Sequence, residues 1–250
     1  MQQDNEESYS DLTALFINCS LKQDKAQSHT QLLINRAAAI MKTEGVAVEQ
    51  VYVLDHTIAV GMIKDGAVEG LADDWPAIQQ KIMQADILVI GTPIWLGVKS
   101  SVATQVIERM YAYSADKNNK GQYLYYGKTG GCIITGNEDG IKHCAMDILY
   151  ALQHVGYSVP PQADCGWIGE AGPGPSYGDT EWDGQPIGDG KTPVGFDSDF
   201  TNRNTTFMSW NLMHMARMLK NNNGLSAVGN TSRDWRQVTN ATGKIESSDD

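Results

Sequence analysis

The loop from Cys19 to Thr30 has the residue types that hold a phosphate group. It places hydroxyl, ammonium and imidazole groups just before a stretch with helical spacing; the candidate binding residues are Ser20, Lys22, Ser28, His29 and Thr30. Unpaired backbone N–H groups and the helix dipole both favour negative charge at a helix N-terminus. The alternative is that Ser28 or Thr30 is an ordinary N-cap residue. The chain has neither G-x-x-x-x-G-K-[ST] nor G-x-G-x-x-G, which argues against an ATP site or a classical dinucleotide site.

A second loop, from Gly91 to Ser100, places a proline and a large aromatic residue directly after an apolar run. Pro93 restricts the turn, and Trp95 can lie along a flat ligand whose edge is met by backbone groups around Ile94 and Leu96. The alternative is that Trp95 is a core residue in a rigid loop. We therefore expect this loop to contact a ring.

The third loop contributes Thr135, Gly136 and Asn137. Gly136 and Asn137 both tolerate a turn in which backbone N–H groups point outward, so they are candidate ligand contacts. Glu138 and Asp139 follow them, and the dipole of the next predicted helix explains these two acids without a ligand.

Other catalytic patterns are missing from the sequence. It contains no G-x-S-x-G nucleophile motif and no H-E-x-x-H zinc motif. The four cysteines lie at least 12 residues apart and form no C-x-x-C pair, and the five histidines form no recognisable ligand set. We expect buried free thiols and no metal.

Short apolar runs and helical stretches alternate along the first 160 residues. The runs are typical of strands buried on both faces of a parallel sheet: Leu12–Asn18, Val46–Leu54, Ile87–Ile90 and Cys132–Ile134. Helical spacing begins after Ser28, Pro76, Ser100 and Gly140. This order predicts an α/β fold, a doubly wound sheet with helices on both faces. Ligands of such sheets bind beyond the carboxyl ends of the strands, where the three loops lie.

The composition changes after Val159. Six of the eight prolines and nine of the 25 glycines fall between Pro160 and Gly195, together with Trp167, Tyr177 and Trp182. We expect the 160–199 insert to be a covering loop or an interface, with disorder as the alternative. A buried helix over 200–220 follows. The expected organisation is a disordered tail at 1–11, one domain at 12–225 and a polar tail at 226–250.

The charge balance excludes some partners. There are 19 Lys and Arg residues against 30 Asp and Glu, a formal net charge of −11, which disfavours binding to nucleic acid. No apolar run approaches the length of a membrane span, and the first eleven residues do not resemble a signal peptide. We expect a cytoplasmic protein with no membrane partner.

Residues 12–159 resemble the flavodoxin-like NAD(P)H-dependent FMN reductases and quinone reductases. Ser20, Lys22, Ser28, His29 and Thr30 match the family loop S-P-R-x-x-S-x-T, with Leu21 in place of the proline and Lys22 in place of the arginine. The family motif P-I-[YW]-x-x-x-x-S is similar to Pro93, Ile94, Trp95 and Ser100, followed by Glu108-Arg109, and the turn beside the flavin ring resembles Thr135-Gly136-Asn137. The chain lacks the cysteine cluster of the iron–sulfur subgroup.

The resemblance implies a five-stranded flavodoxin-like sheet that binds FMN, with NADH or NADPH as the co-substrate. Hydride would pass from the nicotinamide to the flavin, and electrons then to a quinone, a free flavin or a similar small-molecule acceptor. The flavin supplies the chemistry, so we assign no catalytic side chain. The family implies a homodimer or homotetramer. Two alternatives remain: a flavodoxin-type electron carrier without a nicotinamide site, and a flavin-free scaffold of the same fold.

Overall fold

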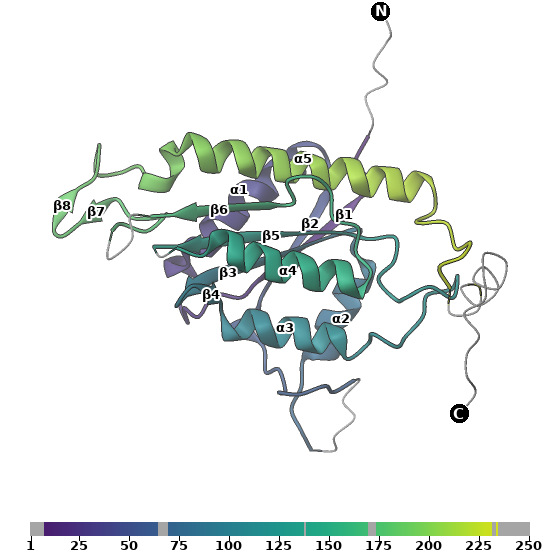
Figure 1. Cartoon of the computed structure of the whole chain (residues 1–250). Helices are drawn as coiled ribbons and strands as arrows, with labels where there is room; N and C mark the ends of the chain where they lie inside the picture. The colour runs from purple at the N-terminus through teal and green to yellow at the C-terminus, as the bar shows by residue number, and fades with distance from the viewer. Residues whose placement is uncertain (1–7, 65–69, 138, 170–173, 232–233, 235–250) are drawn as a thin grey trace, which may run out of the picture.

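Five parallel strands form the centre of the molecule, in the order β2-β1-β3-β5-β6 (Figure 1). The computed structural model describes residues 8–64, 70–137, 139–169, 174–231 and 234. The strands are β1 (Thr13–Asn18), β2 (Ala47–Tyr52), β3 (Ile87–Trp95), β5 (Thr129–Gly136) and β6 (Asp164–Ile168). A short strand, β4 (Val98–Lys99), turns back antiparallel on the end of β3. This is the flavodoxin-like strand order, which confirms the predicted fold.

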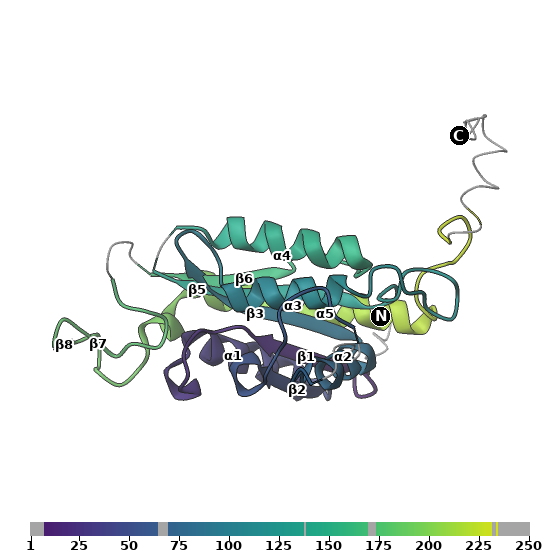
Figure 2. The same ribbon diagram turned by 90° about the horizontal axis from the view of Figure 1, so that it is seen from below.

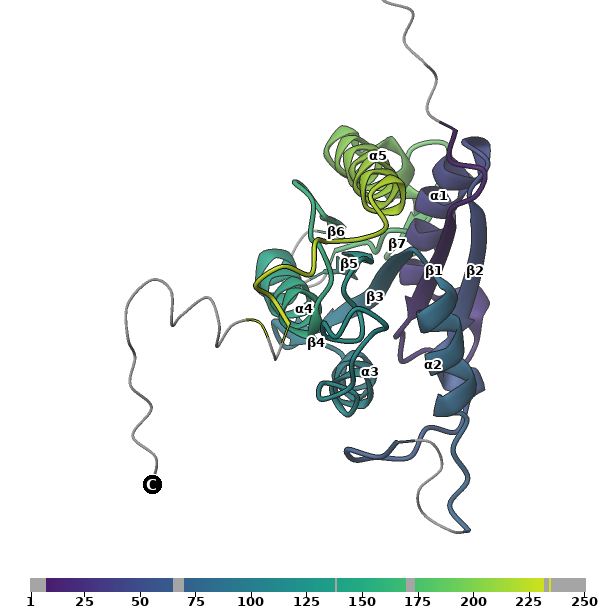
Figure 3. The same ribbon diagram turned by 90° about the vertical axis from the view of Figure 1, so that its right-hand side faces the viewer.

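Helices cover both faces of the sheet (Figure 3). One face carries α1 (His29–Thr43) and α5 (Asp199–Asn221), which pack against each other. The other face carries α2 (Trp75–Gln84), α3 (Ser101–Tyr111) and α4 (Ile141–Val155). Short 3-10 turns lie at Lys25–Gln27, Val53–Asp55 and Val194–Asp197.

Alternate residues of each central strand enter different cores, because successive side chains of a strand point to opposite faces. In β1, Leu15 and Ile17 pack in the core under α2, α3 and α4. Ala14 and Phe16 pack in the core under α1 and α5. Burial on both sides explains why these strands are apolar without a break.

The fifth parallel strand lies inside the proline- and glycine-rich insert, where the sequence analysis placed no strand. β6 pairs with β5 in parallel, from Asp164 beside Cys132 to Ile168 beside Gly136. Gly166 is needed for packing: a Cβ there would lie 2.6 Å from the carbonyl oxygen of Ile134. A two-stranded hairpin, β7 (Glu181–Trp182) with β8 (Gln185–Pro186), projects from one end of the molecule (Figure 2).

Parts of the two expected tails pack on the domain. Tyr9 is buried, and its hydroxyl bonds to Nδ1 of His214 on α5 at 2.8 Å, so the expectation of disorder from 1 to 11 is wrong for residues 8–11. Gln122 donates to the carbonyl oxygen of Ser226 at 3.0 Å, so the start of the 226–250 tail is also held. Residues 1–7 and 235–250 lie outside the described residues. In the ranges described, none of the helices combines the length and the apolar character that crossing a lipid bilayer requires.

Candidate functional site

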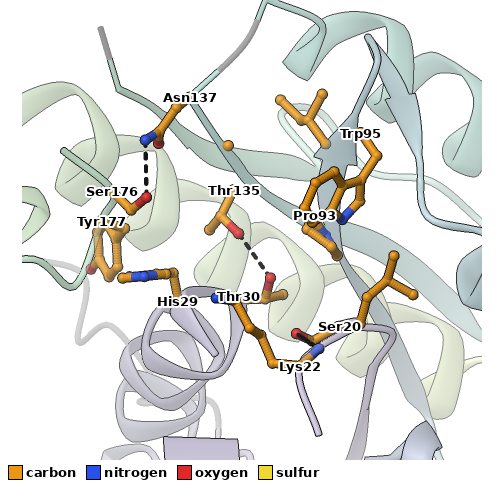
Figure 4. Close-up of a pocket in the computed structure, with 13 residues that line it drawn as sticks. Ser20, Lys22, His29, Thr30, Pro93, Trp95, Thr135, Asn137, Ser176 and Tyr177 are labelled. Carbon is orange, nitrogen blue, oxygen red and sulfur yellow. Dashed lines mark hydrogen bonds between the residues drawn. The ribbon is translucent and has the colours of Figure 1, made fainter. Parts of the chain in front are cut away.

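A pocket of about 610 Å³ opens where β1, β3 and β5 end, at the point where the strand order reverses (Figure 4). The three loops singled out from the sequence meet there. Its lining residues are Ser20, Leu21, Lys22, His29, Thr30, Pro93, Ile94, Trp95, Thr135, Gly136, Asn137, Ser176 and Tyr177. Ser28 and Leu96, two of the expected binding residues, do not line it.

Ser28 is the N-cap of α1, which is the alternative that the sequence left open. Its side chain is buried, and its Oγ accepts a hydrogen bond from the backbone N–H of Gln31 at 3.1 Å. The next two residues, His29 and Thr30, form the first turn, where backbone N–H groups have no acceptor within the helix. His29 and Thr30 therefore bring the N-terminal end of α1 to the pocket. Ser28 caps the helix and does not line the pocket.

Hydrogen bonds hold the backbone of the first loop at Lys22, whose charged side chain is exposed. The N–H of Lys22 donates to Oγ of Ser20 at 3.2 Å, and its carbonyl oxygen accepts from the Tyr52 hydroxyl at 2.6 Å. Lys22 itself is exposed at the pocket mouth. An ammonium group beside a helix N-terminus suits an anion.

Two threonines join α1 to the end of β5. Their Oγ1 atoms lie 2.8 Å apart, and both residues are buried, so Thr30 and Thr135 form a hydroxyl pair between the two sides of the pocket (Figure 4). One hydroxyl donates to the other, and the proton of the acceptor hydroxyl remains available to a ligand.

The wall from β3 is apolar. Ile94 is buried, whereas the side chain of Trp95 is 49 % exposed and faces the pocket mouth. Gly136 lets β5 approach this wall, because a Cβ there would lie 2.8 Å from the Cβ of Ile94. Leu96 turns away into the β3–β4 hairpin, where it is 89 % exposed with φ +52°.

Residues 174–179, here called the covering segment, close another side of the pocket. Nδ2 of Asn137 donates to the carbonyl oxygen of Gly174 at 2.6 Å and to Oγ of Ser176 at 3.0 Å. Farther along, the N–H of Gly178 donates to Nδ1 of His29 at 2.7 Å. Asn137 and His29 thus hold this segment in addition to lining the pocket.

Tyr177 anchors the covering segment in the core. Its ring is fully buried against Trp167 and Phe196, at centroid distances of 5.9 and 5.5 Å. The insert therefore covers the pocket with residues that the sequence did not assign to it. Leu21, Ser176 and Tyr177 were missed; for Tyr177 the signal was an aromatic residue among prolines and glycines.

His29 is held in its neutral form. Burial lowers the pKa of His29 and Lys22 acts in the same direction, while the carboxylate of Asp179 opposes both. Nε2 of His29 lies 3.6 Å from Oδ1 of Asp179. Since Nδ1 accepts from Gly178, the ring proton lies on Nε2.

Two residues of the motifs that resemble the family have structural roles. Ser100 caps α3, and its Oγ also donates to the carbonyl oxygen of Cys19 at 2.8 Å, which ties the second loop to the first. Arg109 is fully buried and forms a paired contact with Asp73 at 3.0 and 2.7 Å.

No group of three or more His, Cys, Asp or Glu side chains that could hold a metal occurs among the residues that the structure describes. All four cysteines are buried and unpaired. Burial raises the pKa of Cys19 and Cys132, so these thiols stay protonated.

A family model described as NADPH-dependent FMN reductase matches residues 12–167. A Mycobacterium bovis protein described as the divalent metal cation transporter MntH is 56 % identical over 210 residues, which cover 84 % of this chain and 29 % of that protein. This chain thus spans less than a third of that relative's length.

Two further comparisons concern flavin enzymes. The 8-demethyl-8-aminoriboflavin-5′-phosphate synthase of Streptomyces davaonensis is 37 % identical over 215 residues, 84 % of this chain and 79 % of that enzyme. The crystal structure of RosB with its bound intermediate 8-demethyl-8-formylriboflavin-5′-phosphate has a TM-score of 0.77 and 33 % identity, covering 94 % of this chain and 88 % of RosB. With the family match over 12–167, these similarities show that the chain belongs to the NADPH-dependent FMN reductase family, which points to FMN as its cofactor and NADPH or NADH as its co-substrate.

Proposed function

We propose that this protein is an FMN-dependent oxidoreductase that takes hydride from NADPH or NADH and passes electrons to a small acceptor such as a quinone or a free flavin. The proposal is based on one observation: the pocket has one polar wall and one apolar wall. One wall offers an ammonium group, hydroxyls and a helix N-terminus, and the other offers the half-exposed ring of Trp95.

The polar wall fits the phosphate of FMN. The first turn of α1 presents its N–H groups at His29 and Thr30, and Lys22 adds a positive charge at the mouth. A phosphate monoester carries a charge of nearly −2, so it gains from both. Neutral His29 adds a ring N–H but no charge.

The apolar wall fits the isoalloxazine ring. Trp95, Ile94 and Pro93 form a face against which a flat aromatic ring can lie. Gly136 lets β5 pack closely against Ile94 of this face.

Bound FMN supplies the redox chemistry, since its ring accepts a hydride and returns electrons to an acceptor. The residues of this chain would bind and orient it: Lys22 and the N-terminus of α1 would hold the phosphate, and Trp95 would position the ring. The covering segment would exclude water from one side of the bound FMN.

Anaerobic titration tests the proposal. The purified protein is loaded with FMN, and one equivalent of NADPH or NADH is added while the visible absorbance of the flavin is followed. Prompt bleaching, followed by reoxidation on adding a quinone, supports the oxidoreductase. Bleaching by dithionite alone supports an electron carrier, and failure to retain FMN in dialysis supports a scaffold.

The comparison with the S. davaonensis synthase favours a second candidate, in which the flavin phosphate is the substrate and is altered at its ring. That enzyme shares 37 % identity over 79 % of its length, and RosB is seen with a modified riboflavin 5′-phosphate. Mass spectrometry of the flavin after incubation with the protein separates the two: an unchanged FMN mass supports the reductase, and a changed mass supports the ring-modifying enzyme.

A further inference from the structure

Ser176 lies between two anchors of the covering segment. On one side Asn137 donates to the carbonyl oxygen of Gly174, and on the other Gly178 donates to His29. The ring of Tyr177, next in the chain, is fully buried, and a Cβ at Gly195 would lie 1.9 Å from it, so the fit around this ring is tight. The position of Ser176 is therefore well determined, although it lies in a loop.

The hydrogen bonds of Asn137 show that the Ser176 hydroxyl does not donate to Asn137. A carbonyl oxygen can only accept, so the contact with Gly174 identifies the nearer atom of the Asn137 amide as Nδ2. The same Nδ2 lies 3.0 Å from Oγ of Ser176, so Ser176 accepts there. The Ser176 proton must then point elsewhere.

The pocket is the place where this proton can be used. Ser176 is half-buried and lines the pocket, and its hydroxyl donates no hydrogen bond to the residues that the structure describes; the neighbouring carboxylate of Asp179 accepts from the backbone N–H of Ser176 at 2.7 Å. Figure 4 shows Ser176 on the side of Asn137 and His29, opposite Trp95, with the Thr30–Thr135 pair between the two sides. A donor in this position faces the polar portion of a ligand whose ring lies on Trp95.

We propose that Ser176 is a binding residue that donates a hydrogen bond to the polar tail of FMN, meaning its ribityl chain or its phosphate. The proposal rests on the proposed binding of FMN. Asn137 is the positioning residue, because its amide turns the hydroxyl toward the ligand. This assigns a binding role to a part of the insert beyond residues 12–167, where the family model matches.

Equilibrium binding tests the proposal, with flavin fluorescence as the readout and three ligands: FMN, riboflavin and lumiflavin, which has the ring without the tail. S176A is compared with wild type and with T206A, a matched loss of a hydroxyl on the exposed face of α5. We expect S176A to weaken FMN about five- to tenfold, as for one lost hydrogen bond, and to leave lumiflavin unchanged. S176T, which keeps the hydroxyl, should restore much of the affinity.

The ligands separate the outcomes. A loss for FMN and riboflavin assigns the bond to the ribityl chain, and a loss for FMN alone assigns it to the phosphate. An unchanged FMN affinity in S176A, or an equal loss for lumiflavin, overturns the proposal while the proposed function stands. If FMN binding depends on Ser176 but NAD(P)H does not reduce the bound flavin, the proposed function is overturned and the role of Ser176 stands. A wild-type protein that binds no FMN overturns both.

Discussion

Nδ1 of His29 accepts a hydrogen bond from the backbone N–H of Gly178 at 2.7 Å, across 149 positions of sequence. This bond joins the first turn of α1 to the covering segment. Only glycine fits at 178, because a Cβ there would lie 2.5 Å from Leu32 and 2.7 Å from the same Nδ1. The cover of the pocket therefore depends on an unprotonated histidine nitrogen.

Acid should weaken this arrangement. Burial lowers the pKa of His29, so below about pH 6.5 the unfolded chain binds a proton that the folded protein does not. The unfolded state then holds more protons, and the free energy of unfolding falls as the pH falls. Urea unfolding of wild type and H29Q from about pH 7.5 to about pH 5.5 checks this. Gln keeps an acceptor but does not titrate, so H29Q should show the flatter profile, and parallel profiles would refute the assignment.

Removing the Trp95 ring should cost affinity rather than stability. Trp95 is 49 % exposed, so W95A loses little packing but loses the face on which we propose that the flavin ring lies. Stacking of this kind contributes about 1–3 kcal/mol, which corresponds to a rise of about five- to 150-fold in the Kd for FMN. W182A is the matched control, since Trp182 is 40 % exposed on β7 and does not line the pocket. Equal losses in the two variants would contradict the role of Trp95.

The charge of Lys22 should matter for the phosphate and not for the ring. We expect K22Q to weaken FMN about tenfold, to leave riboflavin nearly unchanged and to reduce the salt dependence of FMN binding. K25Q provides the comparison, because Lys25 lies in the same loop but pairs with Asp55. Calorimetric titration at two salt concentrations measures these effects, and a riboflavin loss as large as the FMN loss would argue against a phosphate contact.

Leu96 is a strained residue whose replacement should stabilise the fold. It forms the two-residue hairpin turn with Gly97, and φ is +52° at Leu96 and +77° at Gly97, as a type I′ turn requires. Asn tolerates this conformation better, and Leu96 is too exposed to lose packing. L96N should raise the free energy of unfolding by about 0.5–1 kcal/mol, whereas G97A should lower it. A destabilised L96N in urea unfolding would show that the leucine makes a contact that holds the hairpin.

The repeated parts of the fold could be predicted from the sequence. Apolar runs of strand length and helical spacing placed β1, β2, β3 and β5 and each main helix, because burial on two faces leaves a continuous apolar signal. β6 was missed because Gly166 and the nearby prolines look like breakers. The signal available in the sequence was the apolar pair Ala163 and Cys165, two positions apart.

The site residues in loops that follow the predicted strands could be predicted from the sequence. Those contributed by the distant covering segment could not. Pro93 lies near the carboxyl end of β3, Asn137 directly follows β5, and His29 begins the helix after β1, so the topology brings them together. Ser176 reaches the pocket through contacts with Asn137 and with residues around His29, which no local pattern encodes. The sequence was consistent with Ser28 either as a phosphate contact or as an N-cap. The hydrogen bond from the Gln31 N–H to its Oγ identifies it as the N-cap.

A crystal structure of the protein soaked with FMN tests the central claim most directly. We predict that the phosphate lies at the N-terminus of α1 beside Lys22, His29 and Thr30, and that the ring lies along Trp95. Density for FMN elsewhere, or an empty pocket at a saturating concentration, would contradict it.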